Sequence, residues 1–423
     1  MIKTVFCLLI NFYANSQTTF LRDVAPIIKA HCTSCHKKDG SAPFSLETYT
    51  DVSKRGTFIL EVIENKYMPP YPADSLFAAH ANANILSEKE ISTIKSWIKD
   101  GKYKGRSSRK EVYSNKNIRR VKPDLILHPL KPYIIPGDNK EKFKIFVIPT
   151  NLKETTYISA VEYIPGNPRR THHSRIMIDT SNLLRKDNGI DAGDSSEFQK
   201  SGVQMFDEFW KGWVPGNKTS VFYPAGMAKI LPPKADLIIN THYTPGTLEE
   251  EDIFSIQLYL SKEPPKRIIK TFIIDETNVV NGPFFIPPDS IITFYAKSQP
   301  LPYDMSVLSV LPHMHVLGKS FKTFAITPAG EVIPLIYIPK WQFNWQFTYP
   351  FKNLLKIPRG SIIYVQATYD NTANNLLNPY NPPKPVFYGW GTKNEMMNLI
   401  FEFVEYQLGD QNISTQQATI NNF

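Results

Sequence analysis

The chain has 423 residues, of which 42% are hydrophobic and 13% aromatic, a globular composition that excludes general disorder. The formal net charge is +9, and most of it lies in residues 102–122, where nine basic side chains stand against one acid. A basic run beside glycine and serine is more often a solvated linker than a nucleic-acid site. We therefore predict a linker over residues 106–123 and no nucleic-acid partner, although the run could dock an acidic redox protein.

Residues 1–16 have the pattern of a secretory signal. Lys3 precedes the apolar run of residues 5–10, and Ala14-Asn15-Ser16 supplies a cleavage site with small residues. Nothing further along is apolar enough to span a membrane. The sequence predicts an exported protein that starts at Gln17 and works in the bacterial periplasm or outside the cell.

The segment Cys32-Thr33-Ser34-Cys35-His36 has the spacing that covalent haem c attachment needs. The two thiols add to the haem vinyl groups, and the imidazole of His36 binds the iron. A tetrahedral zinc site would need two more ligands of a kind that is missing nearby. We predict one covalent haem c on Cys32 and Cys35.

Residues 17–105 are predicted to form a small all-α haem domain. A helix before the haem motif would start near Asp23 and Pro26, and a second would follow the capping box of Ser87 and Glu90. The sixth iron ligand is predicted to be Met68, because two prolines follow it and hold the thioether outside a helix. His80 is the competing ligand.

From residue 124 onward, short apolar segments alternate with turns rich in Pro, Gly and Asn, which predicts an all-β region. Its length favours two tandem sandwiches, over residues 124–280 and 281–423. Strands are expected over residues 144–149, 157–163, 174–178, 237–244, 253–260, 305–316, 361–369 and 399–406.

Five of the nine histidines fall in three places within this region. His172 and His173 are adjacent, so they could hold one metal only at a strand start or in a loop. His313 and His315 would share one face of a strand, together with Val307, Ser309 and Leu311 and opposite to Met314. Each set alone could also be a buried, hydrogen-bonded structural element, although the spacing of His313 and His315 favours metal binding.

His242 lies on a strand, and by itself it would be an ordinary strand histidine. Near the C-terminus, strand alternation separates Met397, on the core face, from Met396, on the other face. Met396 is therefore the free thioether of the pair.

In order, these positions resemble the copper type II, ascorbate-dependent monooxygenases, the family of peptidylglycine α-hydroxylating monooxygenase and dopamine β-monooxygenase. The resemblance covers residues 124–410 and lies in the segments His172-His173, Thr241-His242-Tyr243, His313-Met314-His315-Val316-Leu317-Gly318, Tyr369-Asp370-Asn371-Thr372 and Glu395-Met396-Met397-Asn398-Leu399. The segment from Met68 to Asp74 resembles haem domains that bacterial members carry ahead of the monooxygenase.

The resemblance implies two jelly-roll-like sandwiches with two copper ions that face each other across a cleft. His172, His173 and His242 would hold an electron-transfer copper. The copper that meets oxygen would be held by His313, His315 and Met396. Coordination chemistry agrees, because imidazole suits both oxidation states of copper and a thioether favours Cu(I).

The expected function is hydroxylation of a C–H bond of a small substrate with O2, with electrons that enter through the haem from ascorbate or a redox protein. Peptide-amidating members carry a carboxylate-binding arginine where this chain has Leu311, which argues against peptide amidation. Two alternatives stay open. One is a non-catalytic haem and copper protein, and the other is an adhesion module joined to a cytochrome.

Overall fold

The computed structural model describes residues 17–106, 121–192, 203–216 and 222–415. The predicted signal and most of the predicted linker lie outside these residues. The chain forms two compact units. The first comprises Met1–Lys38, Phe44–Pro69 and Ile85–Tyr113, and the second comprises Asp39–Pro43, Pro70–Asn84 and Ser114–Phe423.

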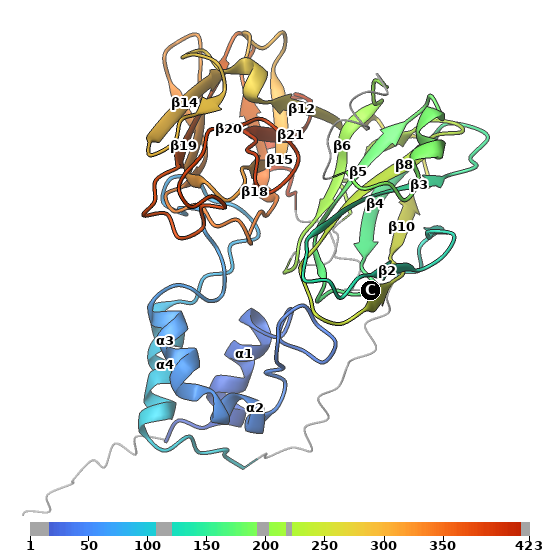
Figure 1. The fold of residues 1–423 in the computed structure, drawn as a ribbon. Coiled ribbons are helices and arrows are strands. Elements are labelled where there is room, and N and C mark those ends of the chain that lie inside the picture. Colours follow the sequence, from blue (N-terminus) through green and yellow to red (C-terminus); the bar gives the residue numbers. More distant parts are fainter. Residues whose placement is uncertain (1–16, 107–120, 193–202, 217–221, 416–423) are drawn as a thin grey trace, which may run out of the picture. The chain divides into compact units, whose positions relative to one another are not determined.

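The first unit is helical (Figure 1). Its elements are η1 (Phe20–Val24, a π-helix), α1 (Ala25–His31), α2 (Tyr49–Lys54), α3 (Gly56–Glu64) and α4 (Glu88–Lys99). They close over a core that includes Phe20, Val24, Ile28 and Trp97. The predicted capping box of Ser87 and Glu90 starts α4. Helices α2 and α3 were not foreseen in the sequence.

The first α-helix starts at Ala25, near the predicted start, but Asp23 is not its N-cap, because the π-helix η1 precedes it. The helical segment begins after Thr19, and the Asp23 carboxylate accepts a hydrogen bond from the Thr19 backbone nitrogen at 2.7 Å. Asp23 thus satisfies a free N–H group from within the first turn. Pro26 lies at the start of α1, where its missing N–H costs nothing.

Residues 70–84, which the sequence places in the haem domain, belong to the second unit. The Asp74 nitrogen donates to the Tyr337 carbonyl at 2.7 Å, and Ala81 donates to Pro350 at 2.7 Å. The ring of His80 is buried in the same unit. This segment therefore pairs with β-strands and not with the helices.

The second unit is built of β-sheets, which confirms the expected sandwich-rich fold. A four-stranded sheet of order β3-β8-β5-β6 and a five-stranded sheet of order β1-β10-β4-β7-β11 enclose the first core. The strands are β1 (Leu125–Leu127), β2 (Tyr133–Ile135), β3 (Lys142–Pro149), β4 (Thr156–Ile164), β5 (Thr171–Asp179), β6 (Asp207–Trp213), β7 (Met227–Leu231), β8 (Asp236–Tyr243), β9 (Glu250–Asp252), β10 (Ser255–Leu260) and β11 (Arg267–Ile268). Strands β2 and β9 pair separately, and the 3-10 helix η2 (Leu183–Asp187) follows β5.

Two further four-stranded sheets, of order β12-β21-β15-β18 and β14-β19-β16-β17, enclose the second core. Their strands, with the small pair β13-β20, are β12 (Lys270–Ile274), β13 (Phe285–Ile286), β14 (Ile291–Lys297), β15 (Met305–His313), β16 (Gly318–Ile326), β17 (Val332–Ile338), β18 (Tyr349–Ile357), β19 (Ile362–Asp370), β20 (Val386–Phe387) and β21 (Asn398–Glu405). The 3-10 helices η3 (Glu276–Asn278) and η4 (Asp410–Asn412) lie in connections. Strand β19 shows the expected alternation, with every second residue buried.

The second sandwich begins earlier than the predicted boundary at residue 280. Strand β11 still pairs with β7 of the first sandwich, whereas β12 pairs with β21 of the second, so the chain crosses over at Ile269. No turn residue marks this crossover. The cluster of Asn281, Gly282 and Pro283 lies instead in a loop of the second sandwich.

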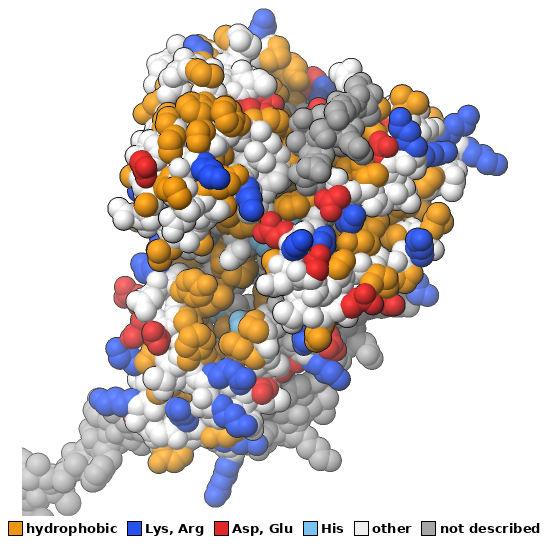
Figure 2. All heavy atoms as spheres, viewed as in Figure 1, with side chains coloured by type: hydrophobic (Ala, Val, Ile, Leu, Met, Phe, Trp, Pro, Cys, Tyr) orange, Lys and Arg blue, Asp and Glu red, His pale blue; other side chains and the backbone are white. Residues whose placement is uncertain are grey.

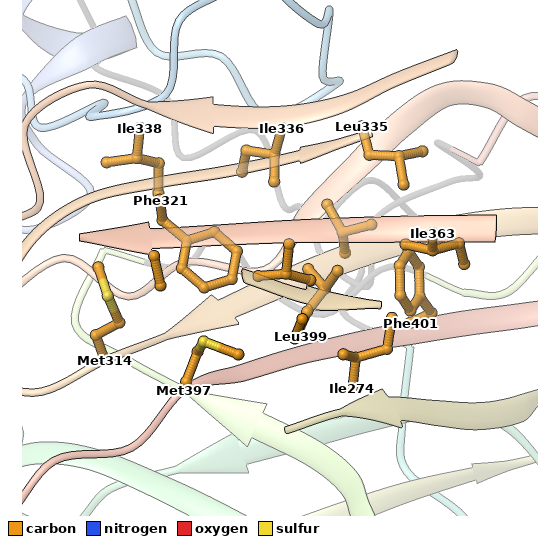
Figure 3. Close-up of a cluster of buried hydrophobic side chains, with 14 of the residues drawn as sticks. Ile274, Met314, Phe321, Leu335, Ile336, Ile338, Ile363, Met397, Leu399 and Phe401 are labelled. Carbon is orange, nitrogen blue, oxygen red and sulfur yellow. The ribbon is translucent and has the colours of Figure 1, made fainter. Parts of the chain in front are cut away.

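A register shift in β15 decides which residues face the second core. The shift lies between Val307 and Ser309, so Val307 is buried in the core although it was expected on the same face as Leu311. Beyond the shift the expected alternation holds. Figure 3 shows Met314 and Met397 in the core with Phe321 and Leu399.

A buried polar cluster joins the two sandwiches. The Lys229 ammonium of β7 lies 3.0 Å from the Glu402 carboxylate of β21 and donates to the Trp210 carbonyl at 2.6 Å. The same carboxylate accepts hydrogen bonds from Tyr223 at 3.1 Å and from Ser309 at 2.9 Å. Burial alone would raise the pKa of Glu402, but the nearby lysine charges lower it to about 2.

On the face shown in Figure 2, basic and acidic side chains are interspersed over the described surface. Among the described residues, no helix is long and apolar enough to cross a membrane.

We expect Glu402→Gln to lower the free energy of unfolding by about 3–5 kcal/mol, because the charge of Lys229 would stay buried without its counterion. The control is Glu405→Gln, which breaks an exposed ion pair with Lys270 and should cost about 0–1 kcal/mol. Urea unfolding measures both. The pKa of Glu402 is depressed, so the difference from wild type should be complete above pH 4.5 and shrink as pH falls toward 2. Equal losses in the two variants would contradict this account.

Candidate functional site

Three histidines of the first sandwich converge at one end of its four-stranded sheet. His172 and His173 lie at the start of β5, and His242 lies opposite His173 on β8. The register shifts between Thr171 and His173, so His172 sits in a β-bulge. The bulge removes the strict alternation of the strand, and two adjacent side chains can approach the same point, as the sequence required.

The ligand atoms of these three rings lie within 4.8 Å of one another. Nδ1 of His172 is 2.9 Å from Nδ1 of His173, and Nε2 of His172 is 3.3 Å from the Asn344 side-chain oxygen. The His242 ring stacks on Phe143 with centroids 4.1 Å apart.

Neither ring nitrogen of His242 has a hydrogen-bond partner among the described residues, although the ring is 2% exposed. The Glu141 carboxylate is the charged group at this ring, 3.8 Å from Nε2. A buried polar atom without a partner is uncommon in native proteins and calls for a ligand.

A second set lies on the other sandwich. His313 is the last residue of β15, His315 follows it in the turn, and their ring centroids are 5.1 Å apart. Nδ1 of His315 donates to the Asn394 carbonyl at 2.9 Å, and Nδ1 of His313 is hydrogen-bonded to Gln346.

Met396 lies with this second set, as the sequence indicated. It precedes β21, and strand pairing places Asn398, two residues on, opposite His313. The adjacent Glu395 carboxylate accepts hydrogen bonds from the backbone nitrogens of His315, at 2.8 Å, and Leu317, at 2.7 Å. Burial raises the pKa of Glu395 to about 8. This side chain ties the methionine segment to the histidine turn.

Two histidines of the first set, His173 and His242, and all three residues of the second set line one chamber between the two sandwiches. The ring centroids of His173 and His313 are 6.4 Å apart, and the Phe343 ring lies 4.9 Å from His172 and 6.3 Å from His315. The lining is formed by His173, His242, His313, His315, Met396, Phe143, Ser174, Arg175, Phe209, Gly212, Trp213, Val214, Asn240, Leu311, Phe343, Gln346, Thr348, Trp390, Thr392, Asn398 and Ile400. Polar and apolar residues both contribute to the lining, and most of the surface that faces the chamber is apolar.

The histidines are held neutral. Burial lowers the pKa of His172 and His315 to about 4 and, with the charge of His315, that of His313 to about 3. Burial also lowers the pKa of His173 and His242 well below the usual value. Neutral imidazole is the form that binds a metal ion.

The donor atoms of both sets fit copper. The first offers three imidazoles at close to the spread that metal–nitrogen bonds of about 2.0–2.1 Å require. The second offers two imidazoles whose Nδ1 atoms are already bonded, which fixes the rings and presents Nε2 to a metal. The thioether of Met396 adds a soft ligand that suits Cu(I).

The haem-attachment segment follows α1 in the helical unit. Cys32 and Cys35 are free cysteines, partly exposed, and a turn joins them through hydrogen bonds from the Cys35 and His36 nitrogens to the Cys32 carbonyl. Nδ1 of His36 is 3.0 Å from the Phe44 carbonyl, which orients the ring and presents Nε2. Free thiols on a turn and a fixed imidazole fit covalent haem attachment.

Of the two candidates for the sixth iron ligand, Met68 lies in the helical unit, directly beyond α3, and it is partly exposed. His80 lies in the other unit, where it is 2% exposed. Its Nε2 is 3.0 Å from the Leu335 carbonyl, and its Nδ1 is 3.4 Å from the Tyr71 hydroxyl. Both nitrogens of His80 are therefore engaged, which favours Met68.

Several residues around the metal-ligand candidates had no signal in the sequence. The irregular segment between β17 and β18 contributes Phe343, Asn344 and Gln346. Such a segment lacks the periodicity of a helix or strand, so its sequence does not predict which side chains face the site. Glu395 stands beside Met396, but only the fold shows that it binds the histidine turn. Phe209, on strand β6, also lines the chamber.

We expect His242→Ala to weaken Cu(II) binding to the first set by about 10²-fold or more, because one of three imidazole ligands is lost. The control is His128→Ala, in the same sandwich, where Nδ1 lies 3.3 Å from the Phe254 carbonyl and outside the chamber lining. Competition against a chromogenic chelator measures the affinity. Unchanged binding in His242→Ala would exclude this ring as a ligand.

No protein-family model matches the chain, and no curated protein matches it. Solved structures give weak similarities. They include PNGF-II, at 9% identity over 66% of this chain and 65% of that chain with a TM-score of 0.28, so the match spans just under two thirds of that chain. Others are the major capsid protein P2 of bacteriophage PM2 (7% identity, 68% and 99% covered, TM-score 0.25) and the VP2 subviral particle of infectious bursal disease virus (10%, 68% and 73%, 0.17). At these scores the similarities carry no argument about fold or function.

Proposed function

We propose that this protein is a copper-dependent monooxygenase of the copper type II kind, with two jelly-roll-like sandwiches and an N-terminal haem c domain. The observation that carries the proposal is that two clustered sets of candidate ligands reach one chamber. His173 and His242, which cluster with His172, line it from one sandwich, and His313, His315 and Met396 line it from the other. The apolar part of the lining leaves a place for a small organic substrate.

The reaction would convert a substrate C–H bond, O2, two electrons and two protons into a hydroxyl group and water. Copper, when bound, supplies electron transfer and oxygen activation. The residues of the chain would do the rest. His172, His173 and His242 would hold the electron-transfer metal at one side of the chamber, and His313, His315 and Met396 would hold the oxygen-reacting metal at the other.

The surrounding residues would keep this chemistry away from bulk water. Phe143 and Phe343 stack on the first set, so His242 is almost completely buried. Gln346, Asn394 and Glu395 fix the rings and the turn of the second set. Fixed ligands lower the cost of rearrangement when the metal changes oxidation state.

Haem c, held by Cys32, Cys35, His36 and Met68, would be the electron inlet. A methionine as sixth ligand raises the iron potential and leaves no open coordination position, which suits electron transfer. Each turnover needs two electrons, and one haem carries one electron at a time. Ascorbate or a redox protein would therefore reduce the haem twice per turnover. Covalent haem is installed outside the bacterial cytoplasm, so we place the protein in the periplasm or outside the cell.

Full-length protein from an exporting, haem-maturing host is expected to contain two coppers and one haem, and to consume O2 only when a substrate is present. Metal analysis, a haemochrome spectrum and an oxygen electrode measure these quantities. Two coppers without substrate-dependent O2 consumption would favour the non-catalytic reading. Protein without copper would exclude both the monooxygenase and the non-catalytic copper protein, and it would leave the hypothesis of an adhesion module joined to a cytochrome.

Removal of copper by chelation is expected to slow reoxidation of the ferrous haem by O2, because electrons would lose their path to the chamber. Stopped-flow absorbance of the haem measures the rate in copper-loaded and copper-free protein. The His242→Ala variant is a third preparation, which weakens copper binding by a single substitution outside the helical unit. Equal rates in all three preparations would rule out the relay.

A further inference from the structure

The chamber contains one charged side chain among its described lining residues, Arg175. Arg175 follows His173 by two residues on β5, and strand register places it directly opposite Asn240 on β8. His173 lies opposite His242 in the same way. Residues directly opposite on antiparallel strands share a face. Arg175 and Asn240 therefore form the next cross-strand pair on this face, about 7 Å along the strands from the pair His173 and His242.

Arg175 keeps donor capacity for a ligand. Its Nε donates to the Glu208 carbonyl at 2.8 Å, and Nη2 is 3.1 Å from the Met177 sulfur. In the described chain Nη1 makes no hydrogen bond, and the carboxylates of Asp207 and Glu208 act on Arg175 only over a longer range. Guanidinium stays charged even when buried.

Aromatic rings from both sandwiches hold this guanidinium in place. Its carbon lies 4.7 Å from the centre of the Trp390 ring, contributed by the second sandwich, and 5.8 Å from that of Phe209 on β6. A cation fixed between rings loses little freedom when it binds a ligand. Arg175 is thus oriented before any ligand arrives.

Asn240 supplies a second donor. The side chain is 7% exposed, and its Nδ2 has no hydrogen-bond partner in the described structure. An unpaired buried amide costs free energy unless a ligand accepts its hydrogen bond. A charged donor and a neutral donor side by side match the two oxygens of a carboxylate.

The space beside this donor pair is apolar. Gly212 on β6 pairs with Arg175, and a Cβ atom there would come within 2.8 Å of the Phe209 ring and 3.7 Å of the Leu311 side chain. Glycine therefore lets Phe209 lie close to the strand. Leu311 and Ile400 are opposite each other on β15 and β21, and both line the chamber together with His313.

We propose that Arg175 and Asn240 bind the carboxylate of an organic acid whose apolar body lies against Leu311, Phe209 and Trp390, toward His313 and Met396. The inference rests on the proposed monooxygenase function and names its substrate class as apolar or aromatic carboxylic acids. Position 311, from which an arginine would reach a carboxylate in amidating enzymes, is here part of the apolar wall.

The test compares 3-phenylpropionate with its neutral amide, by calorimetry on the copper-loaded full chain. Wild type is expected to prefer the acid, and Arg175→Gln should weaken binding of the acid about 10- to 100-fold while the amide changes less than about twofold. Arg175→Lys should restore part of the preference. Asn240→Asp should weaken the acid selectively, because it places a negative charge beside the ligand.

Gln257→Ala is the control, since Gln257 lies on β10, outside the chamber lining. Copper content and thermal unfolding are measured for each variant, and the salt dependence of acid binding by wild type reports the charge even if a variant fails to fold. Wild type that binds neither probe, or that binds both equally, would overturn the proposal, as would equal losses for both probes in Arg175→Gln. Copper content and O2 consumption are scored separately, so an acid preference in a protein that consumes no O2 would refute the monooxygenase and leave this binding site standing.

Discussion

The buried pair of Lys229 and Glu402 is the interaction on which the chamber depends. A lysine that is 1% exposed and a carboxylate from the other sandwich can both stay charged only while they face each other. Glu402 lies on the same face of β21 as Asn398 and Ile400, which line the chamber. The pair therefore fixes one end of the sheet face whose other end carries the second ligand set.

Apolar contacts support the same interface. Met227 and Ile269 of the first sandwich cluster with Leu308, Leu354 and Val404 of the second, beside the buried ion pair. The crossover of the chain at Ile269 runs through this cluster. Because the connection, the apolar cluster and the ion pair coincide, the sandwiches meet in one arrangement. The two sets of ligands approach each other as a consequence, although each is built wholly on its own sandwich.

The sequence was informative where a periodic pattern or a fixed spacing carried the information. Alternation correctly separated Met396 from Met397, and a conflict with alternation correctly placed His172 and His173 at an irregular strand start. The strand pattern in the sequence did not predict the register shift beside Val307, which inserts a residue without any turn signal. The sequence also did not predict the crossover near Ile269. Arg175 and Asn240 were equally hidden. Their meaning comes from pairing between strands more than 60 residues apart, which no local pattern encodes.

The charges of the chamber explain why an anion belongs there. Imidazole and thioether ligands are neutral, so they would not offset the charge of a metal ion. The lining adds the positive charge of Arg175, and its described residues include no acid. The Glu141 carboxylate near His242 is exposed, at the edge of the first set. Uncompensated positive charge is costly in an apolar space. A carboxylate ligand would reduce that cost, and water-soluble neutral molecules would not. The arrangement that would bind the metals would therefore also select the substrate.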